Sequence, residues 1–228
     1  MERHIVALGG SFPGVHAPID HFLLGLTAGE RPRICYLGTA TGDAPNFLVR
    51  FYEAYARRSD ASHLELFGVP PADLRDALLE QDLIWVGGGN TASMLAVWRA
   101  HGVDEALREA WERGIVLAGS SAGAVCWFEA AVTDSFGPDL APMRCLGFLP
   151  GSACPHYDSE ERRRPTFQRL VASGELPPGL AVDDGAGLHF VGTELQEVVA
   201  GVPGARAYRV EPTAEGAAET PLPARQLA

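Results

Sequence analysis

Short apolar stretches alternate with longer amphipathic ones over the first half of the chain. The apolar stretches predict strands at residues 4–10, 33–40, 63–67, 83–86 and 115–118. The amphipathic stretches predict helices at 17–26, 46–58, 72–80, 91–101 and 103–113, with Asn46 and Asn90 as N-caps and Gly114 as a C-terminal stop. Strands separated by helices in this way indicate an α/β fold, in which helices cover both faces of a mostly parallel sheet.

The pattern loosens in the second half of the chain. A helix is predicted at 124–130, a loop-rich stretch at 133–156 and a further helix at 159–173. Short strands are predicted near the end, at 180–183, 187–191, 196–200 and 205–210. The last residues are rich in Pro, Ala, Thr and Glu, without periodicity. We therefore expect a single domain at 1–210 and a flexible tail at 211–228.

Glycine clusters fall where several predicted strands end, namely at Gly9-Gly10, Gly38, Gly87-Gly88-Gly89 and Gly119. In a parallel sheet, the ligand site lies beyond the carboxyl ends of the strands. The glycines, which have the greatest backbone freedom, therefore lie at the edge of the sheet where a ligand site is expected.

The segment Gly119-Ser120-Ser121-Ala122-Gly123 has the G-x-S-x-G pattern of a nucleophile elbow, placed between a strand and a predicted helix. Only Ser121 has glycine both two residues before it and two residues after it. A strained turn at this place exposes the hydroxyl, and the helix N-terminus directs N–H groups at a developing oxyanion. The pattern predicts Ser121 as the nucleophile of a serine hydrolase. The alternative is a tight strand-to-helix connection without catalysis.

A second glycine loop, Gly87-Gly88-Gly89, precedes the helix that Asn90 caps. It can bind an anion at the helix N-terminus or supply the second N–H of an oxyanion hole. It lacks the G-x-G-x-x-G spacing of a dinucleotide-binding loop.

A serine nucleophile needs a base, and His156 is the preferred candidate because it lies in a loop after the nucleophile, directly behind Pro155. His16, in the first glycine loop, is the weaker contender. Four other histidines lie in strand or helix bodies, or at their ends away from the catalytic edge: His4, His21, His63 and His101.

Four aspartates compete to orient that imidazole. Asp184 is favoured because it follows a strand and precedes Gly185, and strand ends hold side chains more firmly than long loops. Asp134 is second. Asp158 is too near His156 in sequence, and Asp183 points to the opposite face of its strand.

The composition of the chain argues against several kinds of active site and binding partner. All 18 basic residues are arginine, which excludes a P-loop lysine, a Schiff-base lysine and a Ser-Lys dyad. The formal net charge of -11 disfavours nucleic acid as a partner. Metal-type histidine spacing is absent, so neither a metal nor another cofactor is expected. The four scattered cysteines are expected to be buried apolar side chains rather than disulfides or zinc ligands.

The sequence also bears on location. It has no apolar run of the ~20 residues that a membrane span requires. Its start lacks the apolar segment and cleavage site of a signal peptide. We therefore expect a cytoplasmic protein without a membrane partner, and a homodimer is left open as an alternative to a monomer.

Three motifs in this order, GGGNT at 87–91, GSSAGA at 119–124 and CPHYD at 154–158, resemble those of the peptidase E (α-aspartyl dipeptidase) family of serine peptidases. The family includes cyanophycinase-like enzymes, and the resemblance covers about residues 4 to 205. It implies a flavodoxin-like three-layer fold, similar to the class I glutamine amidotransferases, with serine in place of their cysteine. It further implies Ser121 as nucleophile, His156 as base, the N–H groups of Gly88 and Ala122 as oxyanion hole, and Asp184 as the acid, where the family more often has Glu.

The resemblance also implies a specificity for peptides with N-terminal aspartate, which an arginine after the histidine loop recognises. Arg163 or Arg164 lies at about that position, and Asn90 completes the expected substrate-binding residues. The alternative is that these arginines form local charge pairs at a solvated helix start. The expected function is a serine exopeptidase acting on short peptides. A cyanophycinase-like or other amide hydrolase and a non-catalytic small-molecule binding protein are the alternatives.

Overall fold

The alternating strands and helices of the first half build the larger of two sheets in the computed structural model, which describes residues 2–228. Its strand order is β14-β11-β10-β1-β5-β4-β2-β3. Five neighbouring strands of this sheet are parallel, as the sequence predicts. They are β1 (His4–Leu8), β5 (Val116–Ser120), β4 (Leu83–Val86), β2 (Arg33–Leu37) and β3 (Asp60–Leu64). β10 (Ala186–Val191) and β11 (Glu194–Ala200) extend the sheet antiparallel.

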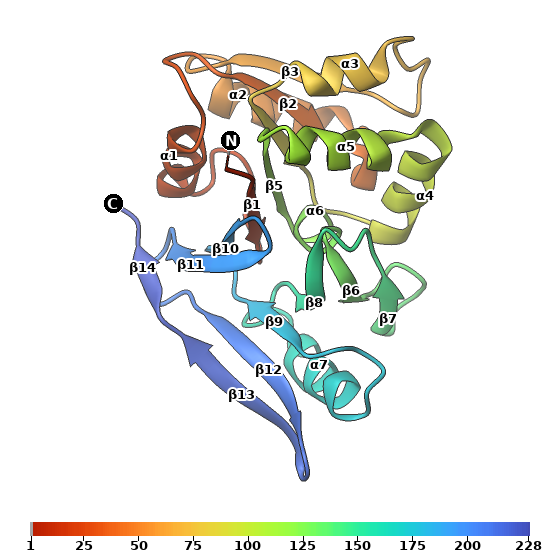
Figure 1. Ribbon diagram of the computed structural model, residues 1–228, viewed down its shortest axis with the longest axis vertical. Coiled ribbons are helices and arrows are strands. Elements are labelled where there is room, and N and C mark those ends of the chain that lie inside the picture. The colour runs from red at the N-terminus through yellow and green to blue at the C-terminus, as the bar shows by residue number, and fades with distance from the viewer. Residues whose placement is uncertain (1) are drawn as a thin grey trace.

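Helices cover both faces of this sheet, which confirms the predicted α/β class (Figure 1). One face packs against α3 (Leu74–Leu79), α4 (Thr91–His101) and α5 (Val103–Glu112), and the other against α1 (Ala17–Gly25) and α2 (Pro45–Tyr55). In β1, Ile5 and Ala7 belong to the first of these cores, and Val6 and Leu8 belong to the second. Alternate side chains of a strand therefore serve opposite layers, and the strand is apolar throughout.

A second, six-stranded sheet lies in the second half of the chain. The sequence predicts only two of its strands, at 180–183 and 205–210, and predicts a helix and a loop between 124 and 156, where three others lie. The order of this sheet is β13-β12-β9-β8-β6-β7, and its members before the C-terminal hairpin are β6 (Phe128–Thr133), β7 (Ala141–Arg144), β8 (Leu149–Cys154) and β9 (Gly179–Val182). The helix predicted at 124–130 is wrong, because α6 spans only Ala122–Val125. β-branched and aromatic side chains at 128–133 favour the strand that follows. β7 contains Pro142, and proline is tolerated there because β7 is an edge strand.

The structure also corrects the expected tail. β12 (Ala207–Thr213) and β13 (Gly216–Leu222) form an antiparallel hairpin, and β14 (Ala224–Gln226) returns to the larger sheet beside β11. Backbone pairing rather than an apolar face holds β13 in place, so hydrophobic periodicity could not reveal it. The assignment of 1–210 to a single domain stays a prediction.

Local boundaries differ in several places. α2 begins at Pro45 with Ala44 as its N-cap, so Asn46 lies inside the helix and does not cap it. β3 begins and ends three residues earlier than predicted, and α7 (Arg163–Ala172) begins four residues later. The Asn90 cap and the C-terminal stop at Gly114 are confirmed, since the Asn90 side chain accepts from Ser93 N and Gly114 has a φ of 89°.

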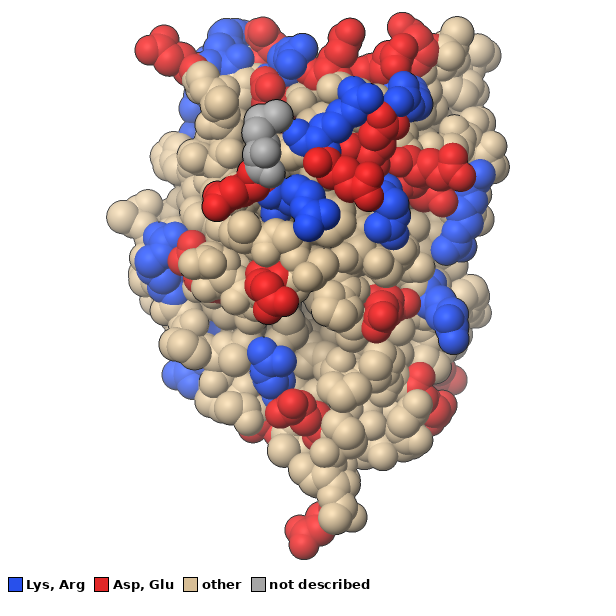
Figure 2. Space-filling model, viewed as in Figure 1, with Lys and Arg blue, Asp and Glu red and all other residues tan. Residues whose placement is uncertain are grey.

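Acidic and basic side chains lie side by side over α3 and α5 on the face that Figure 2 shows. Glu109 of α5 pairs there with both Arg75 and Arg113. Among the described residues, no helix is both long and apolar enough to cross a membrane.

Candidate active site

Ser121 lies in a strained turn between β5 and α6. Its φ of 55° and ψ of -115° are unusual for a residue with a side chain and cost about 1–3 kcal/mol. A hydrogen bond of 3.1 Å from Ser121 N to Leu8 O holds the turn against β1. A Cβ at Gly119 would collide with the carbonyl of Gly123, and one at Gly123 would collide with that of Val86. Packing alone thus explains the glycines on either side of Ser121.

The neighbouring Ser120 has a different task. Its buried hydroxyl accepts a hydrogen bond of 2.8 Å from Ser11 N, which ties the first glycine loop to β5. The Ser11 hydroxyl in turn lies 2.9 Å from Nδ1 of His16. His16, the weaker candidate base, is therefore engaged with Ser11.

His156 and Asp184 follow the ends of two neighbouring parallel strands of the second sheet, β8 and β9. Each lies two residues beyond its strand, so the register of the strands brings the two side chains together. Nδ1 of His156 lies 2.7 Å from Oδ1 of Asp184. The other ring nitrogen, Nε2, is left to bind a second group.

The end of β1 connects this pair to the serine. Gly10 forms a parallel bridge with Asp184, and Gly185 N donates to Gly10 O over 2.8 Å. A Cβ at Gly10 would collide with the Asp184 carboxylate and lie 2.8 Å from Nδ1 of His156. Leu8, two residues earlier, is paired with Ser120 of β5. The three candidate residues therefore gather around one short segment.

Electrostatics favour an ionised carboxylate at Asp184. The hydrogen bond from His156 lowers the pKa of Asp184 below its ordinary value and outweighs the opposing effect of burial. Oδ1 of Asp158 accepts a bond of 2.8 Å from Asp184 N and fixes the backbone at this point. Asp134, the alternative third member, instead lies 3.8 Å from the guanidinium of Arg163.

Gly88 lies directly against the serine. A Cβ on Gly88 would lie 3.1 Å from Cβ and 3.7 Å from Oγ of Ser121. Over residues 2–228, the N–H groups of Gly88 and Ala122 have no hydrogen-bond acceptor within the protein. Free N–H donors beside a nucleophile are what an oxyanion hole requires.

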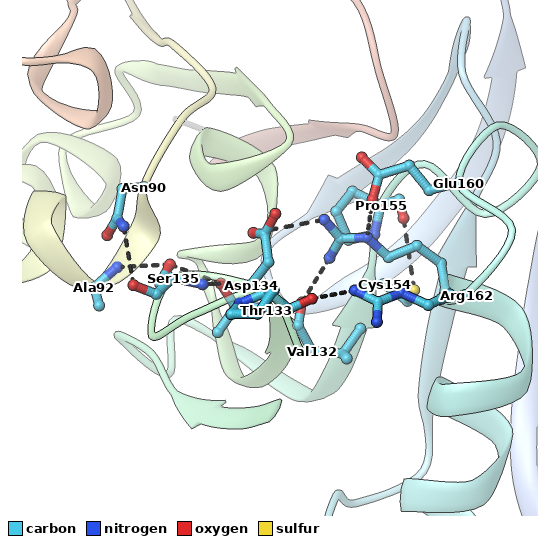
Figure 3. A network of polar contacts seen from close by, with 12 residues as sticks. Asn90, Ala92, Val132, Thr133, Asp134, Ser135, Cys154, Pro155, Glu160 and Arg162 are labelled. Carbon is cyan, nitrogen blue, oxygen red and sulfur yellow. Dashed lines mark hydrogen bonds and ion pairs between the residues drawn. The ribbon is translucent and has the colours of Figure 1, made fainter. Parts of the chain in front are cut away.

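The predicted substrate-binding residues already have partners, as Figure 3 shows for Asn90 and Ser135. Oδ1 of Asn90 accepts from Ser93 N over 2.8 Å, and its Nδ2 donates to Ser135 O over 3.0 Å. Arg163 is buried, with its Nε 2.7 Å from Glu160 and an NH1 bond of 3.1 Å to Val132 O.

Arg164 is partly exposed but also engaged. Its guanidinium lies 3.5 Å from Glu219 and stacks over the rings of Tyr157 and Tyr208. Both arginines therefore have acidic partners within the protein. Only the pair of Arg163 with Glu160 is local in sequence, and Arg163 is buried rather than solvated.

Two contributors escape sequence reasoning: the close approach of Gly10 to His156 and Asp184, and the hydrogen bond from Asp184 N to Asp158. Only Gly10 leaves a signal, because paired glycines at a strand end mark a close approach. The four cysteines are free thiols, and all but Cys145 are buried, as expected.

Asp183 provides a test of stability. Burial, and then the charge of Asp158, raise its pKa from 3.8 to about 6. The folded state therefore holds a proton that the unfolded state releases, and stability falls as pH rises from about 4 to 6. We expect Asp183→Asn to increase the free energy of unfolding at pH 7.5 by about 1–3 kcal/mol, with a smaller gain below pH 5. Denaturant titrations at both pH values check this, and an equal or negative effect at pH 7.5 contradicts it.

Comparison with known proteins finds relatives among peptidases. The model of "Peptidase family S51" matches residues 5–198. The "Uncharacterized peptidase YgaJ" of Bacillus subtilis (strain 168) is 47% identical and covers 99% of both chains. A "Peptidase E" of Streptomyces coelicolor is 27% identical, and the match covers 78% of this chain and 74% of that protein. A crystal structure of a peptidase from an acI-B1 Actinobacterium superposes with a TM-score of 0.73, at 16% identity, over 98% of this chain and 95% of that one.

Proposed function

The chain belongs to peptidase family S51, and we propose that it is a serine exopeptidase that hydrolyses short peptides through Ser121, His156 and Asp184. The observation that carries the triad is the 2.7 Å contact between Nδ1 of His156 and Asp184, at strand ends that Gly10 connects to the serine elbow. Peptidase activity follows from the family, whereas the residue roles are our proposal.

In this proposal, Oγ of Ser121 attacks the peptide carbonyl while Nε2 of His156 takes its proton. Asp184 holds Nδ1, which keeps Nε2 as the basic nitrogen and stabilises the imidazolium that forms. The imidazolium then protonates the leaving amine, and water hydrolyses the acyl-enzyme by the same steps in reverse order. The lowered pKa of Asp184 keeps it charged throughout at neutral pH.

The tetrahedral intermediate carries an oxyanion, for which we assign the N–H groups of Gly88 and Ala122. Both come from backbone that packing holds in place, so little reorganisation is needed when the charge develops. Removing one such donor in other enzymes lowers kcat by about 10²–10³-fold.

A fluorophosphonate probe tests the proposal directly. We expect one covalent adduct per chain on Ser121, located by mass spectrometry, and loss of peptide hydrolysis in step with labelling. Activity is expected to survive EDTA, because imidazole rather than a metal activates this nucleophile. An unlabelled protein, or an adduct on another residue, would contradict the assignment of Ser121.

We further propose that the enzyme does not select N-terminal aspartate. Glu160 and Asp134 surround the guanidinium of Arg163, and Glu219 pairs with Arg164, so a substrate carboxylate would compete with acids already present. We expect matched Asp and Asn dipeptides to differ in kcat/KM by less than about tenfold. A larger preference for Asp that Arg163→Gln or Arg164→Gln removes would contradict this and restore aspartyl specificity.

A further inference from the structure

The C-terminal hairpin, formed by β12 and β13, lies outside the part of the chain that the family model matches. It continues the second sheet next to β9, the strand that leads to Asp184, and it contacts α7, the helix that follows the loop of His156 (Figure 1). Glu219 of β13 forms a hydrogen bond with Tyr157 in that loop.

Glu219 accepts hydrogen bonds from Tyr157, which follows His156 in sequence, and from Gln168 of α7. Its Oε2 lies 2.6 Å from the hydroxyl of Tyr157 and 2.9 Å from Nε2 of Gln168. Its Oε1 lies 3.5 Å from Arg164, and the side chain is only 20% exposed. Such a carboxylate, shielded from water and accepting from two neutral donors and a cation, is held more firmly than a surface ion pair.

Tyr157 directly follows His156 and is almost fully buried. Its ring packs against Phe167 and Tyr208, and its N–H donates to Val182 O over 3.1 Å. His156 itself has a φ of 52°, a left-handed conformation that its surroundings must impose. Burial and Glu219 raise the pKa of the Tyr157 phenol above its ordinary value, so the hydroxyl stays a donor.

We propose that Glu219 is a positioning residue for the hydrolytic reaction. Its carboxylate fixes Tyr157, and Tyr157 holds the strained backbone of His156 at the place where the imidazole meets Asp184. The inference rests on the proposed function of His156. A carboxylate of the terminal hairpin thus takes part in building a site whose other residues all lie before residue 185.

The test compares Glu219→Ala, Tyr157→Phe and their combination with a matched control, Glu215→Gln. Glu215 lies exposed in the turn of the same hairpin, and its carboxylate has no hydrogen-bond or ion-pair partner in the described chain. Misplacing the imidazole by a fraction of an ångström is expected to lower kcat by about 10–100-fold, with KM little changed. The double variant should lose no more than the worse single variant, because both substitutions break one connection.

Two further measurements separate positioning from general destabilisation. Glu219→Gln keeps an oxygen that accepts from Tyr157, so it should retain kcat within about threefold of the unaltered protein. The hydrogen bond between His156 Nδ1 and Asp184 is expected to give a downfield proton resonance in the unaltered protein. This resonance should shift or broaden in Glu219→Ala and Tyr157→Phe but not in Glu215→Gln. If Glu219→Ala does not fold, Tyr157→Phe and Glu219→Gln carry the comparison.

The inference is overturned if folded Glu219→Ala or Tyr157→Phe keeps its kcat and the His156 resonance, or if the two losses multiply in the double variant. That result is distinct from failure of the proposed function. The latter would appear in the unaltered protein as missing fluorophosphonate labelling at Ser121, whereas the resonance reports on Glu219 without any need for turnover.

Discussion

Ser121→Ala is expected to abolish peptide hydrolysis, with a fall in kcat of about 10⁴–10⁶-fold, the range seen when a triad nucleophile is removed. The hydroxyl of Ser121 is the only proposed bond-forming group, and no neighbouring side chain replaces it. Alanine fits the turn without collision, so the fold and the melting temperature should stay close to those of the unaltered protein. Initial rates on a dipeptide panel, together with circular dichroism, check both expectations.

Ser120→Ala is the matched control, because the two serines are adjacent and differ in task. Removing the Ser120 hydroxyl leaves the N–H of Ser11 without its acceptor, which costs about 1–3 kcal/mol of stability. The nucleophile is retained, so hydrolysis and fluorophosphonate labelling should persist. If Ser121→Ala remains active while Ser120→Ala is inert, the elbow has been assigned to the wrong serine.

The strained turn at Ser121 was predictable because its signal is local. A G-x-S-x-G pattern between a strand and a helix fixes the turn, and the collisions at Gly119 and Gly123 explain why those positions carry no side chain. The same holds for Asn90, whose side chain caps the next residues of its own helix. In both cases the residues that decide the structure are neighbours in sequence.

The second sheet was not predictable in the same way. β7 contains a proline, β8 contains Pro150 and Gly151, and β13 has little apolar character, so these three strands are stabilised mainly by their partners rather than by their own pattern. The pairing of β8 with β9 nevertheless decides where His156 and Asp184 meet. Sequence reasoning could select both residues from their loops and glycines, but the sheet that joins them depends on contacts between distant segments.

The arginines illustrate the same limit for specificity. A run of Glu160-Glu161-Arg162-Arg163-Arg164 is compatible with both a carboxylate receptor and a charge-paired helix start. The acidic partners that bear on this choice are remote in sequence, since Asp134 comes from the loop after β6 and Glu219 from β13. A site that binds a substrate carboxylate needs a guanidinium that is not already paired with an acidic side chain of the protein.

Asp184→Asn is expected to lower kcat by about 10⁴-fold, as the corresponding substitution does in the serine protease template. The asparagine is nearly isosteric but presents an amide, which favours the wrong tautomer of His156 and cannot stabilise an imidazolium. Asp134→Asn is the comparison, because it removes the same charge from a residue 3.8 Å from Arg163 and without a hydrogen bond to His156. It should change kcat by less than about tenfold, in keeping with a partly exposed ion pair. Labelling by fluorophosphonate should slow in parallel with kcat in Asp184→Asn, since both reactions need the same base. If only Asp134→Asn shows the collapse, Asp134 is the orienting acid, and the hydrogen bond between His156 and Asp184 serves the structure alone.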